Sequence, residues 1–166
     1  MRFRIQQRFA ADVDDVARAY ADPALYEALV GLPKLARPEV LAHEVDAEVV
    51  RLQVRYHFGG ELSAAARAVI DPAHLTWIEQ STHDLAARST TFRMRPDHYG
   101  DRFRCEGQYH FEPTDDGARR IGHGDVKVKA LLVASAVEAA IISGLEEHLV
   151  DEAPVVEAFV AANRAG

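Results

Sequence analysis

The feature that most constrains the fold is the order in which two hydrophobic periodicities follow each other along the chain. Residues 2–9 alternate, with Phe3, Ile5 and Phe9 separated by charged or polar side chains, which is the period-two pattern of a half-buried strand. From residue 131 onward, apolar residues instead recur every three or four positions, which is the pattern of an amphipathic helix. One strand at the start and one long helix at the end therefore frame the chain.

Two short helices are expected directly after the first strand. Asp12 stands where an N-cap residue belongs and precedes a helical stripe of apolar residues, so a first helix should run to about residue 22. Pro23 suits the first turn of a second helix, which Gly31 and Pro33 terminate. The chain therefore forms two helices before its second strand.

The middle of the chain predicts antiparallel strands. Residues 40–45 and 49–58 are extended in pattern and are joined by a turn at 46–48. After Gly59-Gly60, the Ala-rich residues 62–70 favour a short helix over a strand. Further strands separated by turn-rich segments are expected near residues 75–83, 88–95, 102–112 and 118–129.

A helix over residues 131–162 would be about 48 Å long at ~1.5 Å per residue, enough to cross a whole sheet. Pro154 lacks the N–H that would bond to the Val150 carbonyl, and its ring crowds that turn. We therefore expect a kink at Pro154 or a break into two helices. The complete order predicts an α+β fold in which a curved antiparallel sheet wraps around the C-terminal helix, and such a sheet can hold a cavity.

This order resembles the helix-grip fold of the START-like (SRPBCC) superfamily, whose members include birch pollen allergen-like proteins, steroidogenic lipid-transfer domains and polyketide cyclases. The resemblance rests on the Phe3-to-Phe9 strand, the helix led by Asp12, Pro23, and the stretch 126–129 that enters the long helix. The chain also resembles an uncharacterised family within that superfamily, in which Leu75-Thr76-Trp77 and the strand 107–111 lie in the sheet. The resemblance implies a cavity between sheet and helix for a hydrophobic or amphipathic ligand.

Composition narrows the class of protein and of partner. At 166 residues with 48% hydrophobic side chains, the chain matches one soluble domain spanning residues 1–166. A net charge of −7 opposes attraction to nucleic acid or anionic membranes, and no apolar segment is long enough for stable membrane insertion. A single cysteine, Cys105, excludes an internal disulfide, so together with a start that lacks a signal-peptide pattern it favours a cytoplasmic location.

Alternation predicts which side chains share a face of each strand, and these faces are the candidate ligand-binding surface. Apolar residues of the terminal helix would face them. The alternative is that the same residues fill a packed core without a cavity. The predicted ligand-binding residues are Leu52, Val54, Tyr56, Phe58, Trp77, Phe92, Met94, Phe103, Tyr109, Val137 and Ile141.

The candidate catalytic residues are Glu79, His83 and Tyr109. A carboxyl group facing an apolar cavity has a raised pKa and can transfer protons, and Glu79 shares a strand face with Trp77 and His83. The simpler interpretation places Glu79 in solvent on the outer face, because the facing of this strand is unassigned. The buried hydroxyl of Tyr109 would need a hydrogen-bond partner, which a ligand could provide.

The remaining motifs do not indicate a specific reaction or cofactor. The eight histidines show no metal-ligand spacing, and no cofactor motif is present, so neither a metal nor a cofactor is expected. His148 and Glu152 lie four residues apart on the last helix and could form part of a site, but an exposed pair is the simpler interpretation. Arginines at 93, 95, 102 and 104 give a basic hairpin that could meet an anionic ligand head group or partner, but a solvated strand face is the simpler interpretation.

Three functions follow from these observations. The first is binding of a small hydrophobic or amphipathic molecule, such as a lipid or polyketide-like compound. The second is a cyclase- or dehydratase-like enzyme that uses acid and base groups in the cavity. The third is a protein-interaction module with a filled core. The sequence does not define the ligand or the oligomeric state.

Overall fold

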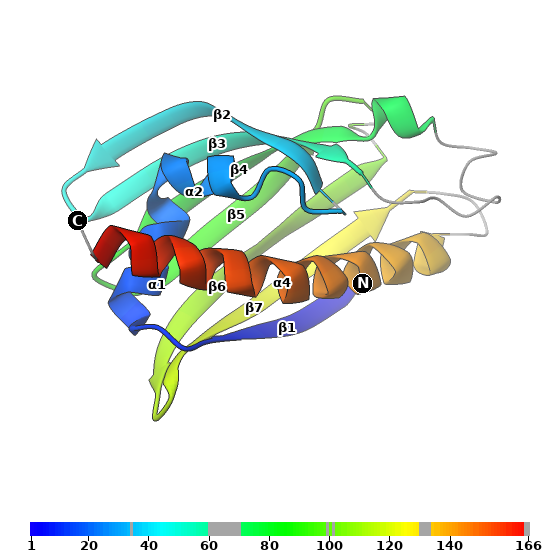
Figure 1. Ribbon diagram of the computed structural model, residues 1–166. Coiled ribbons are helices and arrows are strands. Elements are labelled where there is room, and N and C mark those ends of the chain that lie inside the picture. Colours follow the sequence, from blue (N-terminus) through cyan, green and yellow to red (C-terminus); the bar gives the residue numbers. More distant parts are fainter. Residues whose placement is uncertain (34, 60–70, 99, 101, 130–133, 165–166) are drawn as a thin grey trace.

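Seven strands form one antiparallel sheet in the computed structural model, which describes residues 1–33, 35–59, 71–98, 100, 102–129 and 134–164 (Figure 1). Strands that follow one another from β2 to β7 are neighbours in the sheet, and β1 pairs with β7. Across the sheet the order is β1 (Arg2–Phe9), β7 (Gly117–Val128), β6 (Phe103–Thr114), β5 (Ser89–Pro96), β4 (Thr76–Asp84), β3 (Val49–Phe58) and β2 (Leu35–Asp46).

Helices α1 (Val13–Ala21) and α2 (Pro23–Ala28) connect β1 and β2, the two edge strands of the sheet. The carboxylate of Asp12 accepts a hydrogen bond of 2.8 Å from the N–H of Asp14, and it thereby caps α1. Asp22 caps α2 in the same way, through the N–H of Ala24 at 2.9 Å. Both predicted helices are confirmed, with Pro23 at the start of the second.

The predicted strands are confirmed with small shifts of their ends, and the predicted turn at 46–48 contains Ala47 with a φ of 52°. Strand β2 starts at Leu35, before the predicted residue 40, because register shifts between Ala36 and Glu39 and between Val40 and Ala42 interrupt its alternation. A short 3-10 helix, η1 (Pro72–His74), precedes β4. The helix predicted over 62–70 lies outside the described residues.

The long helix α4 (Ala134–Arg164) continues through Pro154 as one element, so the predicted break into two helices is wrong. Pro154 is exposed, and Val150 one turn earlier is 73% exposed. The Val150 carbonyl, which Pro154 cannot bond, therefore lies on the solvent side, where water can satisfy it.

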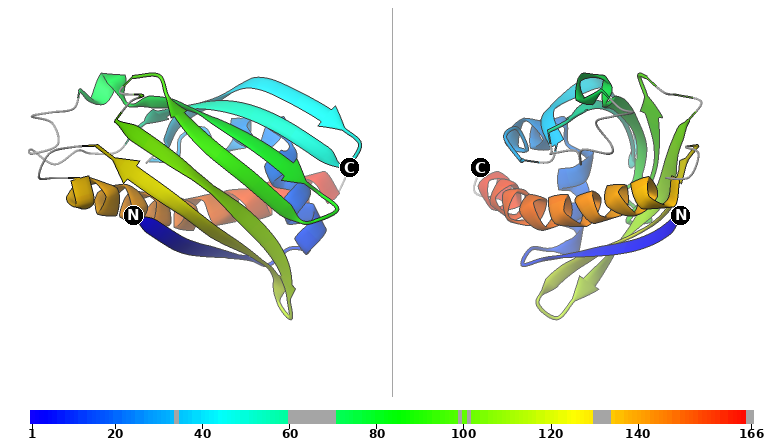
Figure 2. Two further views of the ribbon diagram at one scale, coloured as in Figure 1. Left: turned by 180° about the vertical axis from the view of Figure 1, so that it is seen from behind. Right: turned by 90° about the vertical axis from the view of Figure 1, so that its right-hand side faces the viewer.

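The sheet curves around α4, as the end-on view in Figure 2 shows. The core between them contains Leu25, Leu52 and Val156, each at most 1% exposed. Every fully buried residue of α4 lies in its C-terminal half, from His148 to Val160. Within the described residues, no helix is long and apolar enough to cross a membrane.

Candidate functional site

The predicted ligand-binding residues of the strands come together on the concave face. Leu52, Val54, Tyr56, Phe92 and Tyr109 belong to the buried core, and half-buried Trp77, Met94, Phe103 and Ile141 pack against it. The rings of Tyr56 and Trp77 stack at 5.9 Å, and those of Phe92 and Tyr109 at 5.0 Å. Phe58 and Val137 are half-buried and lie outside this cluster as far as the structure describes it.

A polar cluster, here called the Arg120 cluster, is buried at the other end of the concave face. It contains Gln7 of β1, Tyr20 of α1, Arg120 of β7, and His148 and Glu152 of α4. The Nη1 of Arg120 donates to Oε1 of Gln7 at 3.0 Å and to Oε1 of Glu152 at 3.3 Å. The Tyr20 hydroxyl donates to the same Glu152 oxygen, so four elements meet at one carboxylate.

Further contacts fix the Arg120 cluster. Nε2 of His148 lies 3.1 Å from Oε2 of Glu152, and Nε2 of Gln7 donates to the Leu149 carbonyl at 2.8 Å. The Arg120 guanidinium carbon lies 3.8 Å from the Tyr20 ring centre and 3.6 Å from that of Tyr109. These two rings hold the cation between their π faces. The cluster thereby ties the C-terminal half of α4 to the sheet.

Charge compensation keeps the central pair of the cluster ionised. Burial opposes the charge of Glu152, but the contacts with His148 and Arg120 lower its pKa overall. Burial likewise opposes the charge of Arg120, whereas the nearby Tyr20, Tyr109 and Glu152 raise the pKa of its guanidinium. Burial and the Glu152 carboxylate raise the pKa of Tyr20, so its hydroxyl stays protonated and can donate.

The Arg120 cluster was not predicted from the sequence. The interpretation of His148 and Glu152 as an exposed pair is wrong, since they are only 5% and 6% exposed. The signal was present in the alternation: Gln7 shares a strand face with Ile5 and Phe9, and Arg120 pairs in register with Gln7. A polar residue at an inward position of an alternating strand is the feature that could have found it.

His83 is buried in a hydrogen-bonded group of its own. Its Nε2 lies 3.0 Å from Oγ of Ser81, and its Nδ1 lies 3.0 Å from Oγ1 of Thr90. Burial lowers the pKa of His83 to about 4, so its ring is neutral near pH 7. Both ring nitrogens lie within hydrogen-bond distance of a hydroxyl group, so His83 joins β4 to β5 in the folded protein.

Glu79 faces the interior, which overturns its placement on the outer face. It pairs in register with Val54 and Met94 and lies on the same face of β4 as Trp77, whose ring stacks on Tyr56. Its carboxylate makes no hydrogen bond or ion pair with any described residue. Burial raises the pKa of Glu79 to about 7, although the positive Arg120 acts to lower it.

The raised pKa of Glu79 predicts how stability depends on pH. An unfolded glutamate titrates near pH ~4.3, so between that pH and about 7 the native state binds more protons at Glu79 than the unfolded state does. Stability should therefore fall as pH rises through this window. Glu79→Gln should abolish that fall and be more stable than the wild type at about pH 8, by about 1–3 kcal/mol. Urea denaturation at several pH values measures this, and equal pH slopes for the two proteins would contradict it.

On the concave face, the inward side chains near Glu79 remain partly accessible to solvent, whereas those around Arg120 are buried. Trp77, Glu79, Met94 and Phe103 are half-buried. The N-terminal half of α4 stands near this end, because Glu138 accepts a hydrogen bond of 2.8 Å from the N–H of Val128, the partner of Phe103 in the sheet. No described residue of α4 before His148 is fully buried, and the apolar residues of its N-terminal half that pack against the core, such as Ile141 and Leu145, are only half-buried.

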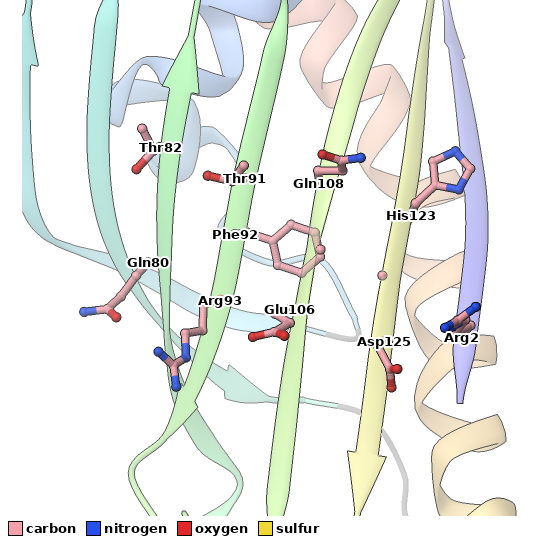
Figure 3. A pocket seen from close by; sticks show the side chains of 12 residues that line it. Arg2, Gln80, Thr82, Thr91, Phe92, Arg93, Glu106, Gln108, His123 and Asp125 are labelled. Carbon is pink, nitrogen blue, oxygen red and sulfur yellow. The ribbon is translucent and has the colours of Figure 1, made fainter.

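A separate hollow of about 610 Å³ lies on the outer face of the sheet, on the side opposite α4 (Figure 3). Its lining includes Thr82, Thr91, Gln108 and His123, whose side chains point away from the core. Phe92, which also borders it, belongs to the buried core. The hollow is thus separate from both Glu79 and the Arg120 cluster. No group of metal-ligating side chains occurs in the part of the chain that the structure describes.

The seven-stranded curved sheet around α4 defines the START-like helix-grip fold. Similar folds occur in a Thermus thermophilus protein (TM-score 0.69, 18% identity, covering 98% of this chain and 99% of that chain). The Zhui aromatase/cyclase of Streptomyces sp. R1128 is also similar (TM-score 0.67, 17% identity, covering 97% and 93%). Norcoclaurine synthase of Thalictrum flavum, in complex with a transition-state analogue, gives a TM-score of 0.65 at 18% identity, covering 99% and 96%.

Within this fold class, the chain belongs to the family described as Protein of unknown function (DUF2505), which matches residues 4–160. A search of the curated proteins found no match. The predicted superfamily resemblance and fold are confirmed. At 17–18% identity, the structural neighbours establish the fold alone.

Proposed function

We propose that this protein binds a small hydrophobic or amphipathic molecule, such as a lipid or polyketide-like compound, between the concave face of the sheet and the N-terminal half of α4. The observation that carries the proposal is the uneven burial along α4, whose fully buried residues all lie from His148 onward. A core that was packed throughout would bury the inward residues at both ends. A cytoplasmic location, expected from the sequence, is part of the same proposal.

The chemistry of the region around Glu79 supports an amphipathic ligand. Its wall is apolar and aromatic, with Tyr56, Trp77 and Met94 beside the carboxyl group of Glu79. The hydroxyls of Tyr56 and Tyr109 form no hydrogen bond within the described residues. Apolar walls with a few polar groups are the usual composition of a small-molecule site. The proposal is further supported by two proteins of the same fold, an aromatase/cyclase and a synthase in complex with a transition-state analogue.

Native mass spectrometry of protein purified from its own host tests the proposal. The wild type is compared with a variant in which a larger side chain fills the proposed site. We expect an added mass that denaturation releases. Ile141→Trp, on the half-buried inward face of α4, should remove that mass while leaving the fold intact. Val150→Trp provides the matched control, because Val150 is 73% exposed on the same helix. Apo protein in all samples, together with no binding of apolar probes, would contradict the proposal.

A second candidate function is acid-base catalysis on a bound carbonyl compound, and one observation favours it. The pKa of Glu79, raised by burial to about 7, lets its carboxyl group both donate and accept a proton near neutral pH. Tyr109 is protonated there, because burial raises its pKa, and it can only donate. Turnover of a bound carbonyl compound that Glu79→Gln abolishes, without loss of binding, would establish this function over binding alone.

A further inference from the structure

We propose that the ligand carries a cationic amine on an apolar body, and that Glu79 neutralises this amine against the rings of Tyr56 and Trp77. The inference rests on the proposed binding function and specifies the chemical class of its ligand. It starts from a carboxyl group that lacks any partner within the described residues, although it faces the interior. A half-buried carboxylate that forms no hydrogen bond or ion pair is costly to ionise, and Arg120 and His148 favour its charge only at longer range.

The sheet register places the aromatic rings beside Glu79. Trp77 lies two residues away on the same face of β4, and Tyr56 is its direct partner on β3, diagonal to Glu79. Diagonal neighbours in an antiparallel sheet are about 7–8 Å apart, which is within reach of long side chains. The two rings stack at 5.9 Å and form one continuous aromatic wall next to the carboxyl group. An ammonium group can contact the carboxylate and a ring face at the same time.

Among the described residues, the basic groups that act electrostatically on Glu79 are Arg120 and His148, and neither forms an ion pair with it. Arg120 lies between Tyr20 and Tyr109, and its Nη1 is used by Gln7 and Glu152. His148 contacts Glu152 at 3.1 Å. Both groups thus contact Glu152 directly, and they reach Glu79 only by longer-range attraction.

The negative charge of the site distinguishes cationic ligands from anionic and neutral ones. The face of an aromatic ring is negative, so a wall of rings beside a carboxylate attracts a cation and repels an anion. A neutral alcohol would gain only a hydrogen bond there. Within the part of the chain that the structure describes, the titratable and charged groups that interact with Glu79 are Tyr26 from α2, Tyr56 from β3, Cys105 and Tyr109 from β6, Arg120 from β7, and His148 and Glu152 from α4.

Isothermal titration calorimetry with matched probes tests the inference. The probes are phenethylamine against phenethyl alcohol, and naphthylethylamine against naphthylethanol, at about pH 8. We expect each amine to bind the wild type at least about tenfold more tightly than its alcohol, as a charge-assisted contact provides. Glu79→Gln should abolish this preference and leave the alcohol affinity within about twofold. Glu44→Gln is the matched control, because it removes the same charge at an exposed position and should keep the preference.

A second readout uses the proton on Glu79. Because its pKa lies at about 7, the amine should bind more weakly as pH falls from about 8 to about 6, and binding should release a proton. Calorimetry in buffers of different ionisation enthalpy measures this release in the wild type. The release should persist in His148→Gln, which excludes His148 as its source.

Two results would overturn the inference, and they differ in what they imply for binding. Equal affinity for amine and alcohol, or an amine preference that Glu79→Gln retains, refutes the amine and leaves the binding function standing. If no probe binds, and protein purified from its own host has the mass of the ligand-free chain, both the amine proposal and the proposed binding function are refuted.

Discussion

Arg120→Met is expected to lower the free energy of unfolding by about 3–5 kcal/mol, because it leaves the Glu152 carboxylate buried without its cation. The variant also removes the group that fills the space between the Tyr20 and Tyr109 rings. The Glu152 contacts join α1, β7 and α4, so their loss should lower the stability of the whole domain and not of one element alone. Urea denaturation at neutral pH measures it.

The double variant Arg120→Met/Glu152→Gln separates charge from packing. It removes both charges and keeps an amide that can bond to Tyr20 and His148, so it should be more stable than Arg120→Met alone. Arg104→Met is the control, because Arg104 forms an exposed pair with Glu106 at 2.7 Å and its loss should not change stability measurably. A double variant as unstable as the single one would show that packing, and not charge, dominates.

Gly107→Ala is expected to destabilise the protein by about 2–3 kcal/mol, since a methyl group there has no space. An added Cβ would collide with the backbone carbonyl of His123 and lie 2.9 Å from the Cα of Gly124, its partner on β7. It would also lie 2.9 Å from Cζ of Phe92. Backbone atoms cannot rotate away as a flexible side chain can, so β6 and β7 would have to separate locally.

Replacing Gly144 by alanine should change the stability in the opposite direction. Gly144 lies inside α4, and an added Cβ there meets nothing within 4 Å. Alanine in a helix interior is more favourable than glycine by about 0.5–1 kcal/mol, so Gly144→Ala should raise the free energy of unfolding. Thermal unfolding of both variants tests the pair, and a shift in the same direction for both would contradict the packing argument.

Local signals were sufficient to predict most of the architecture. Alternation, N-caps at Asp12 and Asp22, and Pro23 act within a few residues, so the order of strands and helices could be recognised without knowing the partners. The two register shifts of β2 and the continuation of α4 through Pro154 were not predicted. Both depend on where a backbone group meets solvent or a neighbouring strand, which periodicity does not record.

The candidate site was predicted less completely. Period two predicted which residues share a strand face with Tyr56, Phe92 and Tyr109, and the structure shows that these faces point inward. The direction in which Glu79 points required the register between β3 and β4. The hydroxyl groups of Ser81 and Thr90, which lie beside the two ring nitrogens of the candidate His83, could be recognised as its neighbours only from the structure.

Element order, strand faces and helix starts could be derived from the amino-acid sequence, because each depends on residues close together in the chain. The pairing of the buried charges could be known only from the folded molecule. Arg120 meets Glu152 across 32 residues of chain and Gln7 across 113, and Glu79 is left without a partner among the described residues. The physical reason is that a buried charge depends on neighbours in space, and folding brings those neighbours from different elements.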